Sequence, residues 1–173
     1  MAENGAPVSP PPDVSHLSAT ELGTALRALP YRQSAFLVIR LLQDRTLEDS
    51  AASYGISPAA FSVHLLRAGL AFTRAAALPC REPADDAEEA LWARVLTEAL
   101  EGEVAGVPPS LVTPVALCRR LRALGPEVVA ALESAEREEE HAPGRRREDL
   151  LRWLAMLALI GLTAYLYFNQ PGK

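Results

Sequence analysis

Residues 51–69, AASYGISPAAFSVHLLRAG, have the pattern of two helices joined by a tight turn. Gly55 suits the left-handed conformation that ends a helix, and Ser57 followed by Pro58 is typical of a helix start. In such a helix-turn-helix, the second helix enters the major groove of DNA. The stretch nevertheless contains only one full cation, Arg67, besides a histidine. A DNA-reading helix would be expected to offer more contacts to phosphates.

The flanking sequence predicts further helices on the N-terminal side. A capping box at Ser18–Glu21 starts one helix, and Thr46 is expected to cap another. The helix of residues 32–43 is apolar on most sides, so we expect it to be the central core helix. The predicted helices in this half cover residues 18–29, 32–43, 46–54 and 57–77.

The second half also lacks the alternating pattern of strands. After a linker at 79–86 we expect helices over 87–100, from 111 or 114 to 124, and over 127–140, with a loop at 102–110. The chain is therefore predicted to be all-α. The expected parts are a disordered leader (1–17), a helix-turn-helix domain (18–78), an acidic helical module (85–142) and a transmembrane helix (150–168).

A known family shares several features of the N-terminal half. Leu29-Pro30 with Arg32-Gln33, the apolar run 36–42, a short acidic helix and the turn Gly55-Ile56-Ser57-Pro58 follow one another. This order resembles region four of bacterial RNA polymerase sigma factors, most of all the extracytoplasmic-function group. The likeness covers about residues 20–75 and implies an ancestor that bound the upstream promoter element and a flexible flap of the polymerase. Nothing before residue 18 resembles the promoter-melting region, so a complete sigma factor is not expected.

The recognition helix departs from that family pattern. The family carries a Lys-Ser-Arg run where this sequence has Ser62-Val63-His64, and Gly69 stands where a basic residue is common. DNA affinity comes largely from phosphate neutralisation, and residues 21–75 carry six arginines against four acids. The competing interpretation is a protein-binding surface, with Val63 and Leu66 covered by another element. The candidate DNA-binding residues are Ser57, Ala59, Ala60, Ser62, Val63, His64, Arg67, Arg74, Arg32 and Arg45.

The net charge of −5 is distributed unevenly. Residues 1–80 are neutral, residues 81–140 carry −8 and residues 141–173 carry +3. The acidic middle has two interpretations, a solvated helix face or a surface that docks on a basic partner, including the arginine-bearing N-terminal segment. In the second case, its acids compete with DNA phosphates for the same arginines.

The segment Trp153–Phe168, WLAMLALIGLTAYLYF, contains no charge. As a helix it spans about 24 Å, which a snorkelling Arg152 extends toward the roughly 30 Å of a bilayer core. Positive charge on its N-terminal side places the bulk of the chain in the cytoplasm, with a single-pass tail anchor in the inner membrane. A buried core helix is the alternative. The expected membrane-flanking residues are Arg145, Arg146, Arg147, Arg152, Trp153, Tyr165 and Tyr167.

No catalytic set is evident from the sequence. The three histidines lie in separate segments, and neither metal-ligand spacing nor a glycine-rich phosphate loop occurs. We therefore expect no enzyme activity, no cofactor and no metal. Cys80 and Cys118 are expected to be reduced, buried thiols.

These features together predict a membrane-tethered helix-turn-helix transcription regulator. It resembles a sigma factor and would act on promoter DNA or on RNA polymerase. The alternative is a tail-anchored adaptor that binds an unknown protein partner and whose helix-turn-helix no longer binds DNA.

Overall fold

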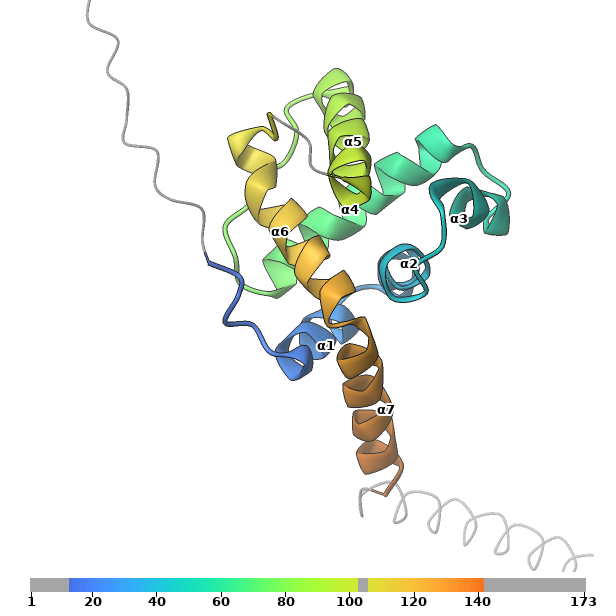
Figure 1. Ribbon diagram of the computed structural model, residues 1–173, viewed down its shortest axis with the longest axis vertical. Coiled ribbons are helices and arrows are strands. Elements are labelled where there is room, and N and C mark those ends of the chain that lie inside the picture. Colours follow the sequence, from blue (N-terminus) through green and yellow to red (C-terminus); the bar gives the residue numbers. More distant parts are fainter. Residues whose placement is uncertain (1–12, 103–105, 142–173) are drawn as a thin grey trace, which may run out of the picture. The chain divides into compact units, whose positions relative to one another are not determined.

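The computed structural model describes residues 13–102 and 106–141, and these residues are all-helical (Figure 1). Seven α-helices and one π-helical turn occur in the described ranges, and no strand is found there. Residues 1–12 of the predicted disordered leader (1–17) lie outside these ranges, whereas Leu17 is described and is buried in the core. The predicted transmembrane helix at 150–168 lies wholly outside them. The expectation of an all-α chain is confirmed for the described residues.

The first helix, α1 (Ala19–Arg27), begins at the predicted capping box. The Ser18 hydroxyl accepts from the backbone N–H of Glu21, and the Glu21 carboxylate accepts from the N–H of Ser18 at 2.8 Å. These reciprocal bonds satisfy N–H groups that a helix start leaves without partners. The local sequence therefore fixes where α1 begins.

Residues 31–42 form two consecutive pieces, α2 (Tyr31–Leu37) and the π-helical turn η1 (Val38–Leu42), where we predicted one helix. The N–H of Gln43 donates to the carbonyl of Val38 at 2.9 Å, which is the longer spacing of a π-turn. The wider turn leaves both Leu41 and Arg40 buried. Burial of an arginine was not predicted.

The quoted stretch forms α3 (Leu47–Ser53) and α4 (Pro58–Ala75), joined by a turn at Gly55. Gly55 has φ +64°, where glycine is free of the strain that other residues meet. The end of α4 was predicted near Ala77, but Ala77 itself adopts φ +55°. The N–H groups of Ala77 and Leu78 return to the carbonyls of Arg74 and Thr73, a Schellman motif that uses alanine in place of glycine.

Three helices follow, α5 (Asp86–Glu101), α6 (Pro109–Ala123) and α7 (Gly125–His141). Asp85 caps α5 by accepting from the N–H of Glu88 at 2.7 Å. At its other end, Arg119 and Arg122 of α6 donate to the carbonyls of Ala99 and Leu100, each at 2.6 Å. These carbonyls have no partner within the helix, so the two arginines tie the end of α5 to α6.

The central helix of the fold is α4, and the expectation that residues 32–43 would be central is wrong. Helix α4 packs against α1, α2, α3, α5 and α6, and crosses the middle of Figure 1. Helix α4 has buried residues on several sides, so it needs several neighbours to cover them. Small residues among them allow these neighbours to approach closely. Fully buried side chains of the shared core include Leu22, Leu37, Leu41, Phe61, Leu65, Leu66, Phe72, Leu96, Leu111, Leu117, Leu121 and Val128.

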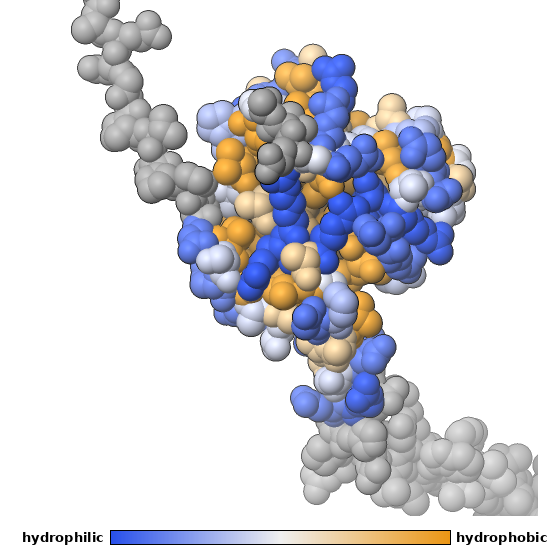
Figure 2. Space-filling view, viewed as in Figure 1, coloured by the Kyte–Doolittle hydropathy of each residue, from blue (hydrophilic) through white to orange (hydrophobic). Residues whose placement is uncertain are grey.

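The described residues up to Leu132 belong to one compact unit. The predicted boundary at 79–84 therefore falls inside a single core that continues from α4 into α5 and α6. In Figure 2 polar and apolar side chains are interspersed over the visible face of this unit. The described residues from Glu133 to His141 belong to a second unit, in which Arg137 and Glu133 form an exposed ion pair at 3.3 Å.

Candidate nucleic-acid interface

The start of α4 is built by local interactions. The Ser57 hydroxyl accepts from the N–H of Ala60 at 3.2 Å, and Pro58 occupies the first helical position. Ser57 and Ala59 are exposed, and Ala60 is half-buried. The two alanines offer no hydrogen bond to a base and no charge to a phosphate, so this end of α4 presents little to DNA.

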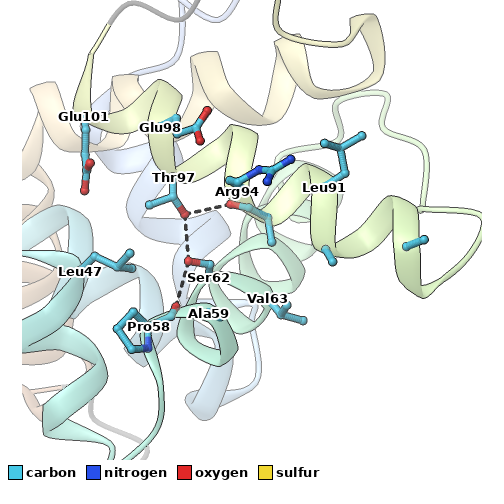
Figure 3. Close-up of a pocket in the computed structure, with 13 residues that line it drawn as sticks. Leu47, Pro58, Ala59, Ser62, Val63, Leu91, Arg94, Thr97, Glu98 and Glu101 are labelled. Carbon is cyan, nitrogen blue, oxygen red and sulfur yellow. Dashed lines mark hydrogen bonds between the residues drawn. The ribbon is translucent and has the colours of Figure 1, made fainter.

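Ser62 lies against α5, and Val63 lines an open groove beside that helix (Figure 3). Ser62 is buried, and its hydroxyl lies 3.1 Å from that of Thr97 in α5. Each hydroxyl can also donate to the carbonyl four residues earlier, at Pro58 and Ala93, so both are satisfied inside the protein. A buried, satisfied Ser62 is not available to read a base.

His64 is half-buried and stacks on Phe36, with ring centroids 5.0 Å apart. Burial lowers the pKa of His64, and the nearby charges of Arg32 and Arg67 lower it further, while Glu89 opposes them. Arg32 itself is exposed on α2. The imidazole is therefore held in its neutral form by the protein and contributes little positive charge near neutral pH.

The two arginines of α4 are both paired with acids that come later in the chain. Arg67 donates from Nε and Nη2 to the two carboxylate oxygens of Glu89, at 2.6 and 2.7 Å. Arg74 pairs with Glu82. The bond from Arg67 lowers the pKa of the Glu89 carboxyl, and the same bond raises the pKa of Arg67. Each predicted phosphate contact on this helix thus already holds a carboxylate.

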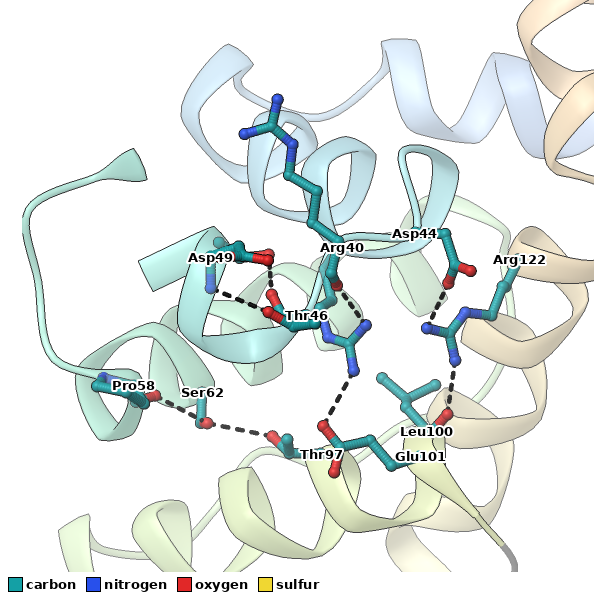
Figure 4. A network of polar contacts seen from close by, with 12 residues as sticks. Arg40, Asp44, Thr46, Asp49, Pro58, Ser62, Thr97, Leu100, Glu101 and Arg122 are labelled. Atoms are coloured by element: carbon teal, nitrogen blue, oxygen red, sulfur yellow. Dashed lines mark hydrogen bonds and ion pairs between the residues drawn. The ribbon is translucent and has the colours of Figure 1, made fainter. Parts of the chain in front are cut away.

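The last predicted residue, Arg45, donates to the Ser53 hydroxyl at 3.0 Å, within the α3 end of the molecule. Sequence analysis missed a different arginine. Arg40 is 3% exposed, donates to the carbonyl of Arg45 at 2.7 Å and pairs with Glu101 of α5 at 3.2 Å (Figure 4). The inward position of Arg40 follows from the π-turn, which the sequence analysis did not predict.

Three ion pairs join arginines of the first half of the chain to acids of the acidic segment: Arg40–Glu101, Arg67–Glu89 and Arg74–Glu82. A fourth pair, Arg122–Asp44, joins the two segments with the charges reversed. Docking on the arginine-bearing N-terminal segment was one of our two interpretations of the acidic middle, and these contacts agree with it. The linker takes part as well, since Arg81 pairs with Glu88 and lies 4.6 Å from the ring centre of Trp92.

An open groove of about 620 Å³ lies between α4 and α5. Its walls are mostly small and apolar, and Leu91 is the large apolar side chain that it leaves partly in solvent, 45% exposed. Arg94 and Glu98 are charged members of its α5 wall. The groove could receive apolar side chains of a partner, whereas it lacks the row of cations that a nucleic acid needs.

Helix α5 packs along α4 on the side that carries Ser62 and Leu66. That side of α4 is covered, whereas the side that carries Ala59 and Arg67 stays exposed.

Other predicted features have simpler outcomes. Both cysteines are free thiols; Cys118 is buried, which raises its pKa to about 12, and Cys80 is half-buried.

No helix among residues 13–102 and 106–141 is long and apolar enough to cross a membrane. The predicted membrane-flanking residues, from Arg145 to Tyr167, lie outside the described part of the chain.

Comparisons of this chain with family models, with curated proteins and with solved structures found no match.

Proposed function

We propose that this protein is a non-enzymatic, membrane-tethered adaptor whose helix-turn-helix, formed by α3 and α4, serves as a protein-binding scaffold and does not read DNA. The observation that carries the proposal is the packing of α5 along α4. It buries Ser62 and Leu66, half-covers Val63 and leaves the two arginines of α4 paired with acids.

The energetics favour a permanent arrangement over a removable cover. Trp92, Leu96 and Leu100 of α5 are buried in the same cluster as Leu66 and Leu70 of α4. Burial of each such side chain contributes about 1.5–3 kcal/mol, so detaching α5 would cost on the order of 10 kcal/mol. This is as large as the whole stability of a typical domain. Detachment of α5 from α4 is therefore strongly disfavoured in the folded protein.

The α4–α5 groove is the surface that we assign to the protein partner. Its shape suits a short amphipathic helix, because the alanines along both walls allow close approach. Arg94 and Glu98 have opposite charges one helical turn apart, so the partner helix should carry an acid and a base at matching spacing.

A second candidate function is a sigma-factor-like transcription regulator that acts on promoter DNA or on RNA polymerase. The exposed Arg32 and the half-exposed Arg67 and Arg74 favour it, because surface ion pairs are weak and phosphates can compete for these cations. The resemblance of residues 20–75 to sigma region four supports the same candidate.

The two candidates are separated by a salt-titrated binding measurement on the full chain, with a fluorescent 25-base-pair duplex as the probe. The adaptor should show no saturable binding at 50 mM salt. Binding that weakens steeply as salt rises would overturn the adaptor proposal and favour the regulator, because such a slope reports contacts to phosphates.

The membrane tether is a separate part of the proposal and is supported by the sequence of residues 150–168 alone. Cell fractionation of the full chain should place it in the membrane pellet, resistant to high salt and released by detergent. A matched chain with Leu157, Leu159 and Leu162 changed to aspartate should move to the soluble fraction. Recovery of the unaltered chain in the soluble fraction would contradict the tether.

A further inference from the structure

Glu82 and Glu89 lie where phosphates of a nucleic-acid backbone would be bound by the two arginines of α4. Arg67 and Arg74 are seven residues apart, which is two helical turns or about 10 Å along the helix axis. Their guanidinium groups, with Gln33, Glu82 and Glu89, line one cleft of about 310 Å³. Both carboxylates come from the acidic segment, which is net −8 over residues 81–140.

The chemistry of the contact does not distinguish a carboxylate from a phosphate. Arg67 grips both oxygens of Glu89 in the parallel two-bond geometry that guanidinium groups use for either anion. A phosphate that approaches Arg67 or Arg74 must therefore displace a carboxylate that is already held at high local concentration. The same carboxylates also repel the phosphate.

We propose that Glu82 and Glu89 act as built-in phosphate mimics that mask a backbone-binding surface for duplex nucleic acid, formed by Arg67 and Arg74. This inference rests on the proposed function, since it gives a reason why this helix-turn-helix does not bind DNA. Contact with a backbone along the surface does not require α4 to enter the major groove, so the mask acts in addition to the cover that α5 provides.

The mask can be removed without disturbing the fold. The side chains of Glu82, Arg74 and Arg67 are 68%, 54% and 55% exposed, whereas that of Glu89 is only 14% exposed. The exposed Arg74–Glu82 pair contributes little to stability and the less exposed Arg67–Glu89 pair contributes more, but α5 is held mainly by its buried apolar side chains. Exchange of the two acids for glutamine should therefore free the arginines and leave α5 in place.

The test compares the full chain with its E82Q/E89Q variant, using a fluorescent 25-base-pair duplex of arbitrary sequence as the probe. We expect the unaltered chain to show no saturable binding at 50 mM salt and the variant to bind saturably, at least tenfold above the weakest affinity that the titration detects. Because two arginines become available, log affinity of the variant should fall with log salt with a slope of about −1.8.

The matched control is E48Q/E127Q, which removes an equal number of negative charges from exposed acids on α3 and α7, for which no contact with either arginine is found. It should gain much less than E82Q/E89Q. A further variant, E82Q/E89Q with R67Q/R74Q, should return to the affinity of the unaltered chain. Thermal unfolding midpoints check that all variants fold.

Two outcomes would overturn the mask. One is no gain in a folded E82Q/E89Q chain, and the other is an equal gain in both double variants, which would mean that net charge alone matters. Neither outcome affects the adaptor proposal, which duplex binding by the unaltered chain would overturn.

Discussion

Arg40 is a charged residue that is almost completely buried. Its guanidinium group is buried, its Nε has no partner, and burial together with the charge of Arg122 lowers its pKa against the opposing effects of Glu101 and Asp44. Burial of a charge is tolerated only when hydrogen bonds compensate it. Here the carbonyl of Arg45 and the carboxylate of Glu101 supply them.

We expect Arg40→Ala to lower the free energy of unfolding by about 2–3 kcal/mol. The change leaves a cavity and removes the donor to the Arg45 carbonyl. Glu101→Gln should cost less than about 1 kcal/mol, since that acid is 54% exposed and can be hydrated. Urea titration followed by fluorescence measures both. Similar losses in the two variants would show that the ion pair, and not the packing of Arg40, is what matters.

The pKa of His64 gives a prediction for pH. The folded protein lowers this pKa below the 6.5 of an exposed histidine, so the unfolded chain binds the proton more readily. Stability contributed by neutral His64 is thus complete above about pH 7 and is lost as pH falls through 6.5 toward the folded-state pKa. His64→Phe should keep the stack on Phe36 and lose less stability between pH 7 and pH 5.

Thermal unfolding across this pH range compares the two chains directly. The carboxyls whose pKa values are lowered, such as Glu89 and Glu21, lose stability in acid in both chains. The difference between the chains therefore reports the histidine. Parallel pH profiles would contradict the assignment.

Helix boundaries in this chain depend on residues in the left-handed region. Gly55 ends α3 with φ +64° in open space, and Ala77 ends α4 with φ +55°. The first was predictable, because glycine meets no strain there. The second was not, because alanine disfavours this conformation and only the two bonds of the Schellman motif hold it.

Substituting alanine for Gly55 and glycine for Ala77 should therefore change the free energy of unfolding in opposite directions. Gly55→Ala should lower the free energy of unfolding by about 1–2 kcal/mol through backbone strain alone, because nothing lies within 4 Å of the added carbon. Ala77→Gly should raise it by about 0.5–1 kcal/mol, the relief of strain less the greater entropy of the unfolded chain. Changes of the same sign in urea titrations would contradict this account of the two turns.

The packing of α5 on α4 joins two segments that we had expected to be separate modules. A chain of residues 1–80 lacks α5 and α6, so it would expose Leu66 and Leu70 to water. We expect this fragment to show no cooperative thermal unfolding. Residues 1–132, the compact unit, should unfold cooperatively.

Circular dichroism during heating distinguishes the two fragments. A sharp transition in residues 1–80 would show that α3 and α4 are stable without α5. In that case α5 would be a removable cover, and the transcription regulator would become the better supported function.

The sequence by itself determined the local features of this protein. Capping residues fixed the starts of four helices, and a glycine fixed the end of one, because each acts on backbone groups within a few residues. The caps are Ser18, Thr46, Ser57 and Asp85, and the glycine is Gly55. The all-helical character followed from the same short-range periodicity.

Only the tertiary structure decided which surfaces remain available. The central position of α4 and the burial of Arg40 at the π-turn depend on how the helices pack. The pairs Arg67–Glu89 and Arg74–Glu82 join α4 to residues beyond its C-terminal end. The charge blocks indicated that acidic and basic segments could meet, but not which side chains would pair. That choice depends on burying the apolar faces of α4, α5 and α6 together, a global condition that no short stretch of sequence contains.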